Sequence, residues 1–431
     1  MLKNKILNNA SWIIIGKLGQ SLCSFIVTML TARCYGPSNF GLINYAASLL
    51  AFFQPIAMLG LDNIQVQELV EHEKEEGKIV GTTLTLSFVS SIFCYIFVIV
   101  FSSMTNINEK ITIIVCALYS IGIFFQGTNL IGYWFQARYL SKFSSIINLF
   151  AYFLICAYKV YILISGKSIF WFAISNTMDL MLSFLMLYIS YQKHGGSKLQ
   201  FSSSVAKRMF AKSKYYILVN LMVVIFGQTD KVMLKLMVDT TATGFYSAAI
   251  TCSNLVSFIY LAIIDSARPT IFLKYKKGEK EFENSMMILY AVITYLSVVI
   301  CIGTVVFAPF IIHIIYGSAY DVSIQALRIV VWYIPFSYIG TVRNIWILAE
   351  GKQKWLTPIN VVGALSNVIL NLALIPVWGV NGAAVASLLT QVFTNIVVSN
   401  FIPETRRSII LLFKSLNPKY IIETLEGFIT R

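Results

Sequence analysis

Five ionisable residues lie deep inside long apolar runs, where they could do chemistry: Lys17, Asp179, Asp230, Lys231 and Arg343. A charge in hydrocarbon is costly, so each residue needs a partner, a water-filled cavity or an escape to the interface. Three cations against two carboxylates would leave such a cavity weakly positive. Either Asp179 or Asp230 could bind a coupling proton or cation. The alternative is a structural salt bridge from one of these carboxylates to one of the three cations.

Uncharged polar side chains recur at helical spacing in the apolar runs and form stripes on single helix faces. Unsatisfied amides in hydrocarbon are costly, so the stripes must face protein or water. Hydrogen bonding between helices is the simpler explanation, whereas several helices striped alike favour a shared hydrated cavity. The candidate cavity residues are Ser21, Ser24, Thr28, Asn44, Gln126, Asn129, Tyr133, Asn176, Asn220, Asn360, Asn367 and Asn371.

The composition indicates a membrane protein. The chain of 431 residues is 57% hydrophobic and 12% charged, with a mean hydropathy of +0.75. Soluble domains carry about twice that charged fraction. The net charge of +14 sits in loops between apolar runs, which indicates a membrane and not a nucleic acid as the partner. The seven cysteines form no C-x-x-C pair, and we interpret them as small core residues.

Apolar runs of about 18 to 24 residues predict an all-α integral membrane protein with twelve spans. The expected spans are 10–33, 40–61, 79–101, 111–135, 144–164, 169–190, 215–238, 244–264, 286–309, 325–348, 357–375 and 380–401. They divide into a six-helix bundle (1–195), a basic cytoplasmic linker (196–214), a second six-helix bundle (215–401) and an interfacial tail (402–431).

The lysines and arginines predict the orientation. The N-terminus, the even-numbered loops and the tail hold 24 of them, whereas the odd-numbered loops hold three. Positive loops stay inside, so both termini are expected in the cytoplasm. The cations of the linker could bind anionic lipid or serve topology alone. The acidic loop from Glu68 to Lys78 is expected to be a solvated surface.

The two halves of the chain are related. At an offset of 212 residues Trp134 matches Trp346 and Asn148 matches Asn360, and near an offset of 203 Gly41 matches Gly244. Six spans is an even number, so the repeats have the same orientation in the membrane. Parallel repeats of this kind are typical of transporters that bind their substrate between the halves.

Motifs for catalysis are missing. Gly166-Lys-Ser168 lacks the first glycine of a phosphate loop, so neither ATP nor its hydrolysis is expected. The three histidines are scattered without the spacing of metal ligands. The outer loops are short and nearly free of charge. We therefore expect no enzyme, no cofactor, no metal and no nucleic-acid partner.

Several motifs resemble O-antigen flippases and related polysaccharide transporters. They are Asn8 to Trp12, Ala32 to Gly41, Thr229 to Leu234, Ala242 to Ala249, Glu350 to Lys354, and Ile375 to Ala384. The resemblance implies the fold of the multidrug/oligosaccharidyl-lipid/polysaccharide (MOP) exporters: two six-helix bundles, as in the MATE transporters, with alternating access. It also implies a plasma-membrane protein (the inner membrane of a bacterium) and, as partners, polysaccharide polymerase and chain-length proteins.

Members of that family move an undecaprenyl-pyrophosphate-linked oligosaccharide from the inner to the outer leaflet. The hypothesis is that Lys17, Lys231 and Arg343 attract the pyrophosphate while the polar stripes exchange hydrogen bonds with sugar hydroxyls. One alternative is an ion-coupled drug or cation antiporter on the same fold. Another is a scaffold for polysaccharide synthesis that transports nothing.

Overall fold

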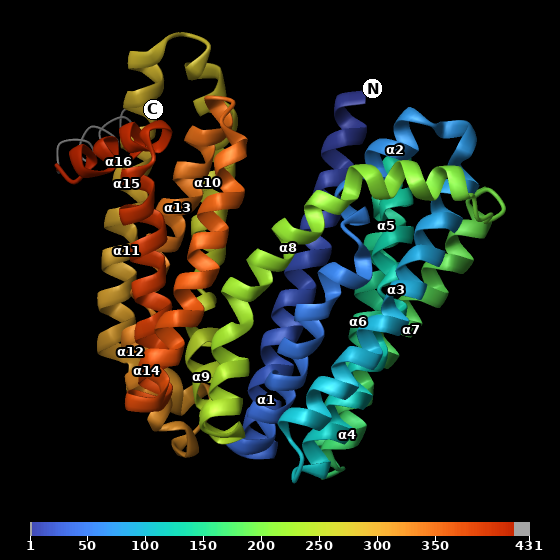
Figure 1. The fold of residues 1–431 in the computed structure, drawn as a ribbon, viewed down its shortest axis with the longest axis horizontal. Coiled ribbons are helices and arrows are strands. Elements are labelled where there is room, and N and C mark those ends of the chain that lie inside the picture. The colour runs from blue at the N-terminus through green and yellow to red at the C-terminus, as the bar shows by residue number, and fades with distance from the viewer. Residues whose placement is uncertain (1, 418–431) are drawn as a thin grey trace. The chain divides into compact units, whose positions relative to one another are not determined.

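The computed structural model describes residues 2–417, apart from the side chains of residues 2–11, 13–18 and 258. Over this described range the chain forms helices and no β-strand. It divides into two compact units, Met1–Gln228 and Thr229–Arg431, and the division falls inside one long helix, α8 (Figure 1). The predicted linker 196–214 lies in the first unit. The predicted boundaries of bundles, linker and tail remain predictions.

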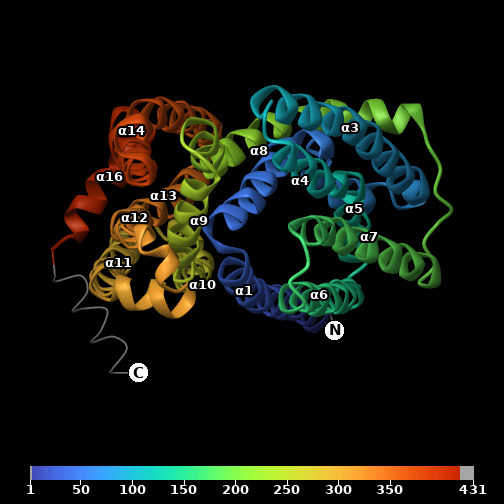
Figure 2. The ribbon, with the colours of Figure 1, turned by 90° about the horizontal axis from the view of Figure 1, so that it is seen from below.

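The first unit is a helical bundle, and Figure 2 shows the long connection between its helices α7 (Ile169–Lys193) and α8 (Ser203–Met237). Its elements are α1 (Leu2–Met58), η1 (Leu61–Asn63), α2 (Gln65–Glu71), η2 (Glu73–Glu75), α3 (Glu76–Thr105), α4 (Lys110–Ser120), η3 (Ile121–Phe125), α5 (Gly127–Ala137), α6 (Ser141–Ile164), α7 (Ile169–Lys193) and the first part of α8 (Ser203–Met237).

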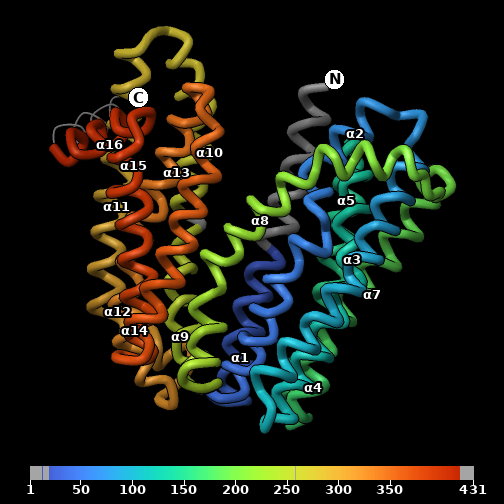
Figure 3. The backbone as a smooth tube through the Cα atoms, in the orientation of Figure 1, coloured from blue at the N-terminus to red at the C-terminus, as the bar shows by residue number. Residues whose placement is uncertain are grey.

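The second unit is also helical, and its path can be followed in Figure 3. After the end of α8 it contains α9 (Thr240–Asn254), α10 (Ser257–Tyr275), α11 (Glu279–Ile315), η4 (Ser318–Tyr320), α12 (Val322–Val330), α13 (Tyr333–Ala349), η5 (Gln353–Trp355), α14 (Leu356–Val392), the π-helical turn η6 (Phe393–Val398), α15 (Ser399–Phe401) and α16 (Pro403–Ser415).

Two of the longest helices, α1 and α14, are each broken at a glycine. In α1 the break is at Gly36, which has φ 71° and ψ 176°. A residue with a Cβ rarely adopts this conformation, and Pro37, which follows, has no N–H to continue the ladder. In α14 the break is at Gly379. At each of the two breaks the sequence predicts one span before the glycine and one span after it.

Nine helical stretches in the described part of the chain are long and apolar enough to cross a membrane, or ten if the bent pair α9 and α10 forms one span. Two stretches, Gly19–Met58 and Gln353–Phe401, contain 40 and 49 residues and include the glycine breaks. At about 1.5 Å per residue each has the length for two crossings of a core about 30 Å thick. The all-α membrane fold is confirmed. The count of twelve and the cytoplasmic termini remain predictions.

Aromatic side chains pack closely against one another inside each unit. In the first unit the buried Trp134 meets Phe135 and Tyr191 edge to face, with ring centroids 4.9 and 4.7 Å apart. In the second unit Phe282 stacks on Trp346 with centroids 4.9 Å apart. Lipid is as apolar as the core, so close packing of this kind stabilises helix contacts in a membrane.

The acidic loop is only in part the solvated surface that the sequence predicts. Glu71 and Glu73 are exposed, whereas Glu68 and Glu75 face the first turns of α8. Glu68 is 1% exposed and accepts from Arg208 Nε at 3.1 Å and from Lys212 Nζ at 2.5 Å. Arg208 also donates to Glu75 at 2.7 Å. Two of the linker cations that could bind anionic lipid, Arg208 and Lys212, are therefore paired with carboxylates of the same unit.

A second carboxylate of the loop holds the chain that precedes α8. Glu76 is 3% exposed, pairs with Arg138, and accepts from the backbone N of Ser197 at 3.1 Å. The backbone N of Gln200 donates to Gly77 O at 3.1 Å. The segment between α7 and α8 is thus docked on the start of α3.

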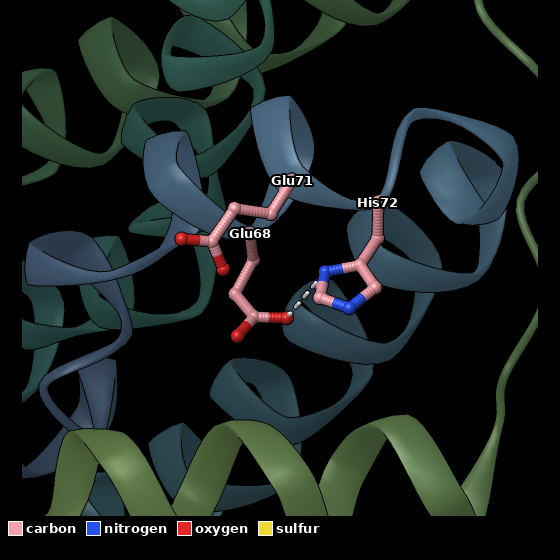
Figure 4. A group of neighbouring side chains, drawn as sticks. All are labelled: Glu68, Glu71 and His72. Atoms are coloured by element: carbon pink, nitrogen blue, oxygen red, sulfur yellow. Dashed lines mark ion pairs between the residues drawn. The ribbon is translucent and has the colours of Figure 1, made fainter.

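Figure 4 shows Glu68, Glu71 and His72, whose ligand atoms lie within 4.8 Å of one another. Such a group could hold a metal by spacing alone. Its central carboxylate, Glu68, is already paired with Arg208 and Lys212, whose charges would repel a cation. We interpret the group as part of the ion-pair network.

Candidate functional site

Asp230, in the second unit, is a buried acid whose carboxylate accepts four side-chain hydrogen bonds. It lies on α8 and is 5% exposed. Its Oδ1 accepts from Asn371 Nδ2 at 2.6 Å and from Asn367 Nδ2 at 3.0 Å. Its Oδ2 accepts from Tyr246 Oη and Ser387 Oγ, each at 2.5 Å. Four neutral donors thus satisfy a carboxylate that burial alone would penalise heavily.

Local structure explains how these five side chains meet. Asn367 and Asn371 are four residues apart on the first half of α14, so they share one face. The break at Gly379 turns the chain, and Ser387 comes from the second half of the same helix. Tyr246 belongs to α9, which begins where Asp239 accepts from the N–H of Ala242 at 2.7 Å.

The Asp230 cluster is rich in oxygen. Besides the carboxylate it contains two hydroxyls and two amide oxygens, and Asn371 Oδ1 is buried without a hydrogen-bond partner in the described part of the chain. Carboxylate, hydroxyl and amide oxygens are the ligands that hard cations prefer. The arrangement can therefore hold either a proton on Asp230 or a small cation.

The three predicted cations differ in their surroundings. The side chain of Lys17 lies outside the described residues. Lys231 follows Asp230 on α8 and is half-buried. Arg343, on α13, is 3% exposed and donates to Ser399 Oγ at 2.6 Å, Asn344 Oδ1 at 3.0 Å and Thr394 O at 3.4 Å. A phosphate reaching Arg343 would have to replace some of these bonds.

Asp179 lies on α7 in the first unit and is half-buried. It interacts electrostatically with Lys159 of α6, whose Nζ also lies 5.5 Å from the ring centroid of Phe172. Lys159 is not among the sequence-predicted partners of Asp179. Asp230 interacts electrostatically with a lysine as well, Lys231, so a nearby lysine does not separate the two acids. Asp230 is the better cation ligand because two hydroxyls and two amides surround its carboxylate.

Some predicted cavity residues bond within the bundle instead. Gln54 Nε2 donates to Gln126 Oε1 at 3.2 Å, and Asn176 Nδ2 donates to the backbone O of Tyr119 at 3.5 Å. Asn44 Nδ2 donates to the backbone O of Phe40, one turn earlier, at 2.9 Å. The bonds of Gln126 and Asn176 fit the simpler explanation, hydrogen bonding between helices, whereas Asn44 bonds within its own helix. Four others are exposed or half-buried on their helices: Ser21, Ser24, Thr28 and Asn360.

A polar pocket of about 390 Å³ opens between α1, α5 and α6 of the first unit. Its lining includes Gln20, Asn129, Tyr133, Gln136 and Asn148. A second pocket of about 340 Å³ shares Asn129 and Tyr133 with it and adds Asp62 and Asn220. Both volumes are in the range of small-ligand sites, about 300–1,000 Å³.

Sequence reasoning missed several residues of these sites. Tyr246 and Ser387 donate to Asp230, yet the sequence places neither of them in a stripe of polar residues that includes a charged one. Asn148 lines the polar pocket from α6, and its sequence position gave only a match between the two halves of the chain. The sequence does indicate Gln20, at the edge of the polar face of α1, and Gln136, which continues the spacing of Asn129 and Tyr133 on α5 by three residues.

Comparisons with known proteins agree with this architecture. A family model described as "Polysaccharide biosynthesis protein" matches residues 30–325. An uncharacterized membrane protein from Methanocaldococcus jannaschii is 22% identical over 294 residues, which are 67% of this chain and 55% of that protein. The chain thus matches about half the length of this curated relative.

Two solved structures share the fold. An inward-facing multidrug-resistance MATE family transporter of the MOP superfamily has a TM-score of 0.71 at 10% identity, with 91% of this chain and 95% of that chain covered. The lipid II flippase MurJ, in an inward closed conformation, has a TM-score of 0.68 at 15% identity, with 95% and 92% covered. At such identities the likeness concerns the fold, and both neighbours are transporters, not enzymes.

Proposed function

The chain belongs to the polysaccharide biosynthesis protein family, and from that premise we propose that it is a lipid-linked oligosaccharide flippase. It moves an undecaprenyl-pyrophosphate-linked repeat unit, of an O-antigen or a related surface polysaccharide, from the inner to the outer leaflet by alternating access. The polymerase and chain-length proteins that act on such a product are its proposed partners.

One observation carries this proposal: the uncharged, hydrogen-bonding pocket of the first unit. Asn129, Tyr133 and Gln136 lie at positions i, i+4 and i+7 of α5 and line it together. Amides and hydroxyls can exchange hydrogen bonds with sugar hydroxyls, and this exchange offsets the loss of water on binding. An apolar drug would leave the same polar groups unsatisfied.

We assign the coupling ion to the Asp230 cluster. A cation or proton that binds Asp230 changes the charge of a buried site lined by Asn367, Asn371, Ser387 and Tyr246. Such a change stabilises whichever conformation solvates it better, and in this way a gradient can drive alternating access. Asp179, which interacts electrostatically with Lys159, is the second candidate.

The pyrophosphate is assigned to Lys17, Lys231 and Arg343. Arg343 donates to Ser399 and Thr394, so a phosphate that binds it must replace some of these bonds. Lys17 and Lys231 are tested first. Replacing each with glutamine removes the charge and keeps a hydrogen-bonding side chain of similar size.

Flipping in liposomes tests the function directly. Purified protein is reconstituted with a fluorescent undecaprenyl diphosphate disaccharide, and a glycosidase outside the vesicles reports how much has crossed. The wild type is expected to expose the inner pool, and Lys17→Gln, Lys231→Gln, Asp230→Asn and Asp179→Asn to slow its exposure. Full activity in every one of these variants would contradict the assignment.

The same vesicles distinguish the alternatives. An ion-coupled drug or cation antiporter, which the Asp230 cluster would also suit, should exchange an organic cation for sodium or protons and leave the lipid in place. A scaffold should do neither and should tolerate neutralisation of every deep charge.

A further inference from the structure

We propose that the pocket between α1, α5 and α6 is a subsite for an uncharged sugar of the substrate, and that Asp62 beside it rejects acidic sugars. This inference rests on the proposed flippase function, which it extends from lipid-linked oligosaccharides in general to the sugar class that one subsite accepts. It concerns the first unit alone.

Thr128 and Ser144 of the pocket lining donate to backbone carbonyls, but part of the hydrogen-bonding capacity of the pocket is unused. Within the described part of the chain, the side chains of Asn129, Tyr133 and Gln136 make no hydrogen bond to protein. Gln126, one turn before Asn129 on the same helix face, is by contrast bonded to Gln54. Helix stabilisation therefore explains Gln126 and leaves the next three polar residues of the stripe available for a ligand.

A further unpaired group comes from the opposite wall. Asn148 of α6 lines the pocket, and its Oδ1 is buried without a hydrogen-bond partner in the described range. A buried acceptor left unpaired destabilises the protein, and a hydroxyl donor of a ligand in the pocket would remove that cost. Amides from two facing helices, together with the ring of Tyr133, match a sugar that has hydroxyls at its edge and C–H groups on its face.

The charge of the side chains in and beside the pocket determines which part of the substrate the pocket can bind. All described side chains that line the pocket are uncharged, whereas a pyrophosphate or a uronate is bound best by cations. An acid, Asp62, lines the adjoining pocket, which shares Asn129 and Tyr133. Asp62 also interacts electrostatically with the hydroxyl of Tyr133. A carboxylate on the sugar would face this charge without compensation, whereas an uncharged sugar would not.

Binding to the full-length protein in lipid nanodiscs tests the subsite. Three water-soluble probes share a short prenyl diphosphate: one has no sugar, one has a glucose disaccharide, and one has the same disaccharide with a terminal glucuronate. Calorimetry is expected to give at least tenfold tighter binding of the neutral disaccharide than of the glucuronate.

Variants then locate the discrimination. Asn129→Ala, Gln136→Ala and the conservative Tyr133→Phe should each weaken binding of the neutral disaccharide about three- to tenfold and leave the sugar-free probe unchanged. Asp62→Asn should tighten binding of the glucuronate probe to within about threefold of the neutral one. Gln192→Ala, an exposed glutamine at the end of α7, is the matched control and should bind all three probes like the wild type.

The outcomes separate the two proposals. Equal affinity for the neutral and acidic disaccharides, or an equal loss for all three probes in the pocket variants, overturns the subsite and leaves the flippase function standing. If no prenyl diphosphate binds to the wild type, the flippase function fails, and the subsite fails with it. Thermal unfolding of each variant shows that the fold is retained.

Discussion

Asn371 Nδ2 lies 2.6 Å from Asp230 Oδ1, although 141 residues separate the two in sequence. The contact joins α8 to α14 inside the second unit, and Asn367, one turn earlier, donates to the same oxygen. The buried carboxylate of Asp230 depends on these neutral donors. Removing the carboxylate or one of its donors should therefore change the transport rate and the free energy of unfolding.

Asp230→Asn is expected to reduce substrate flipping at least tenfold, because an amide cannot carry the charge change that couples an ion to the conformational cycle. Cation binding should disappear with it. If sodium is the ion, added sodium raises the unfolding temperature of the wild type through linkage and leaves that of Asp230→Asn unchanged. Asp265→Asn is the matched control, because the Asp265 side chain is 61% exposed and lies outside the cluster.

Ser387→Ala tests the neighbours of this charge. The substitution removes one of the two donors to Asp230 Oδ2 and leaves Tyr246 as the other. Losing a hydrogen bond to a buried charge costs about 1–3 kcal/mol, so the free energy of unfolding should fall by that amount. Chemical denaturation in detergent measures it, and an unchanged free energy would show that water replaces the hydroxyl.

Glu68→Gln should destabilise the first unit by about 1–2 kcal/mol. The substitution removes the shared acceptor of Arg208 and Lys212 and leaves both cations facing an amide. Loss of a fully buried partner costs more, but these two cations are 30% and 46% exposed and water compensates them in part. Glu73→Gln is the comparison, since its side chain is 74% exposed and lies 3.8 Å from Arg138. A similar loss in both variants would argue against a special role for Glu68.

The sequence predicts a helical membrane protein and identifies most of the charged residues that lie deep in its apolar runs. Hydropathy suffices for this, because the hydropathy of a span depends only on residues that are neighbours in sequence. It also predicts that Asn367, Asn371 and Asp230 are polar positions facing protein or water. It does not predict that they meet, because helical periodicity says nothing about which faces touch. Tyr246 and Ser387 carry no such signal, since single hydroxyls are common in membrane helices. The burial of Glu68 in the acidic loop was not predicted for the same reason: its partners, Arg208 and Lys212, are distant in sequence.

Gly81→Ala should detach the segment that precedes α8. A Cβ at Gly81 would lie 2.5 Å from both the backbone N and O of Gln200, so one of the two chains must move. The bond from Ser202 N to Thr82 Oγ1, now 3.0 Å, should then be lost. Trypsin is expected to cut after Lys198 about tenfold faster than in the wild type. Gly303→Ala, where no atom lies within 4 Å of the added Cβ, should be cut at the wild-type rate.

Discrimination against acidic sugars should weaken as the pH falls. Burial raises the pKa of the Asp62 carboxyl above its ordinary value of about 3.9, although Asn63 Nδ2, which donates to Asp62 Oδ1 at 3.0 Å, opposes the shift. Tyr133 is the titratable group that faces Asp62 from α5, and it stays neutral over this range.

Above its raised pKa Asp62 is ionised and repels the glucuronate probe, whereas below it the carboxyl is neutral and the repulsion is lost. The ratio of the two dissociation constants, glucuronate over neutral disaccharide, should therefore fall between about pH 8 and pH 4, and it should begin to fall at a higher pH than an exposed aspartate would allow. In Asp62→Asn the ratio should stay low and flat. If that variant keeps the pH dependence of the wild type, another group is responsible for the discrimination.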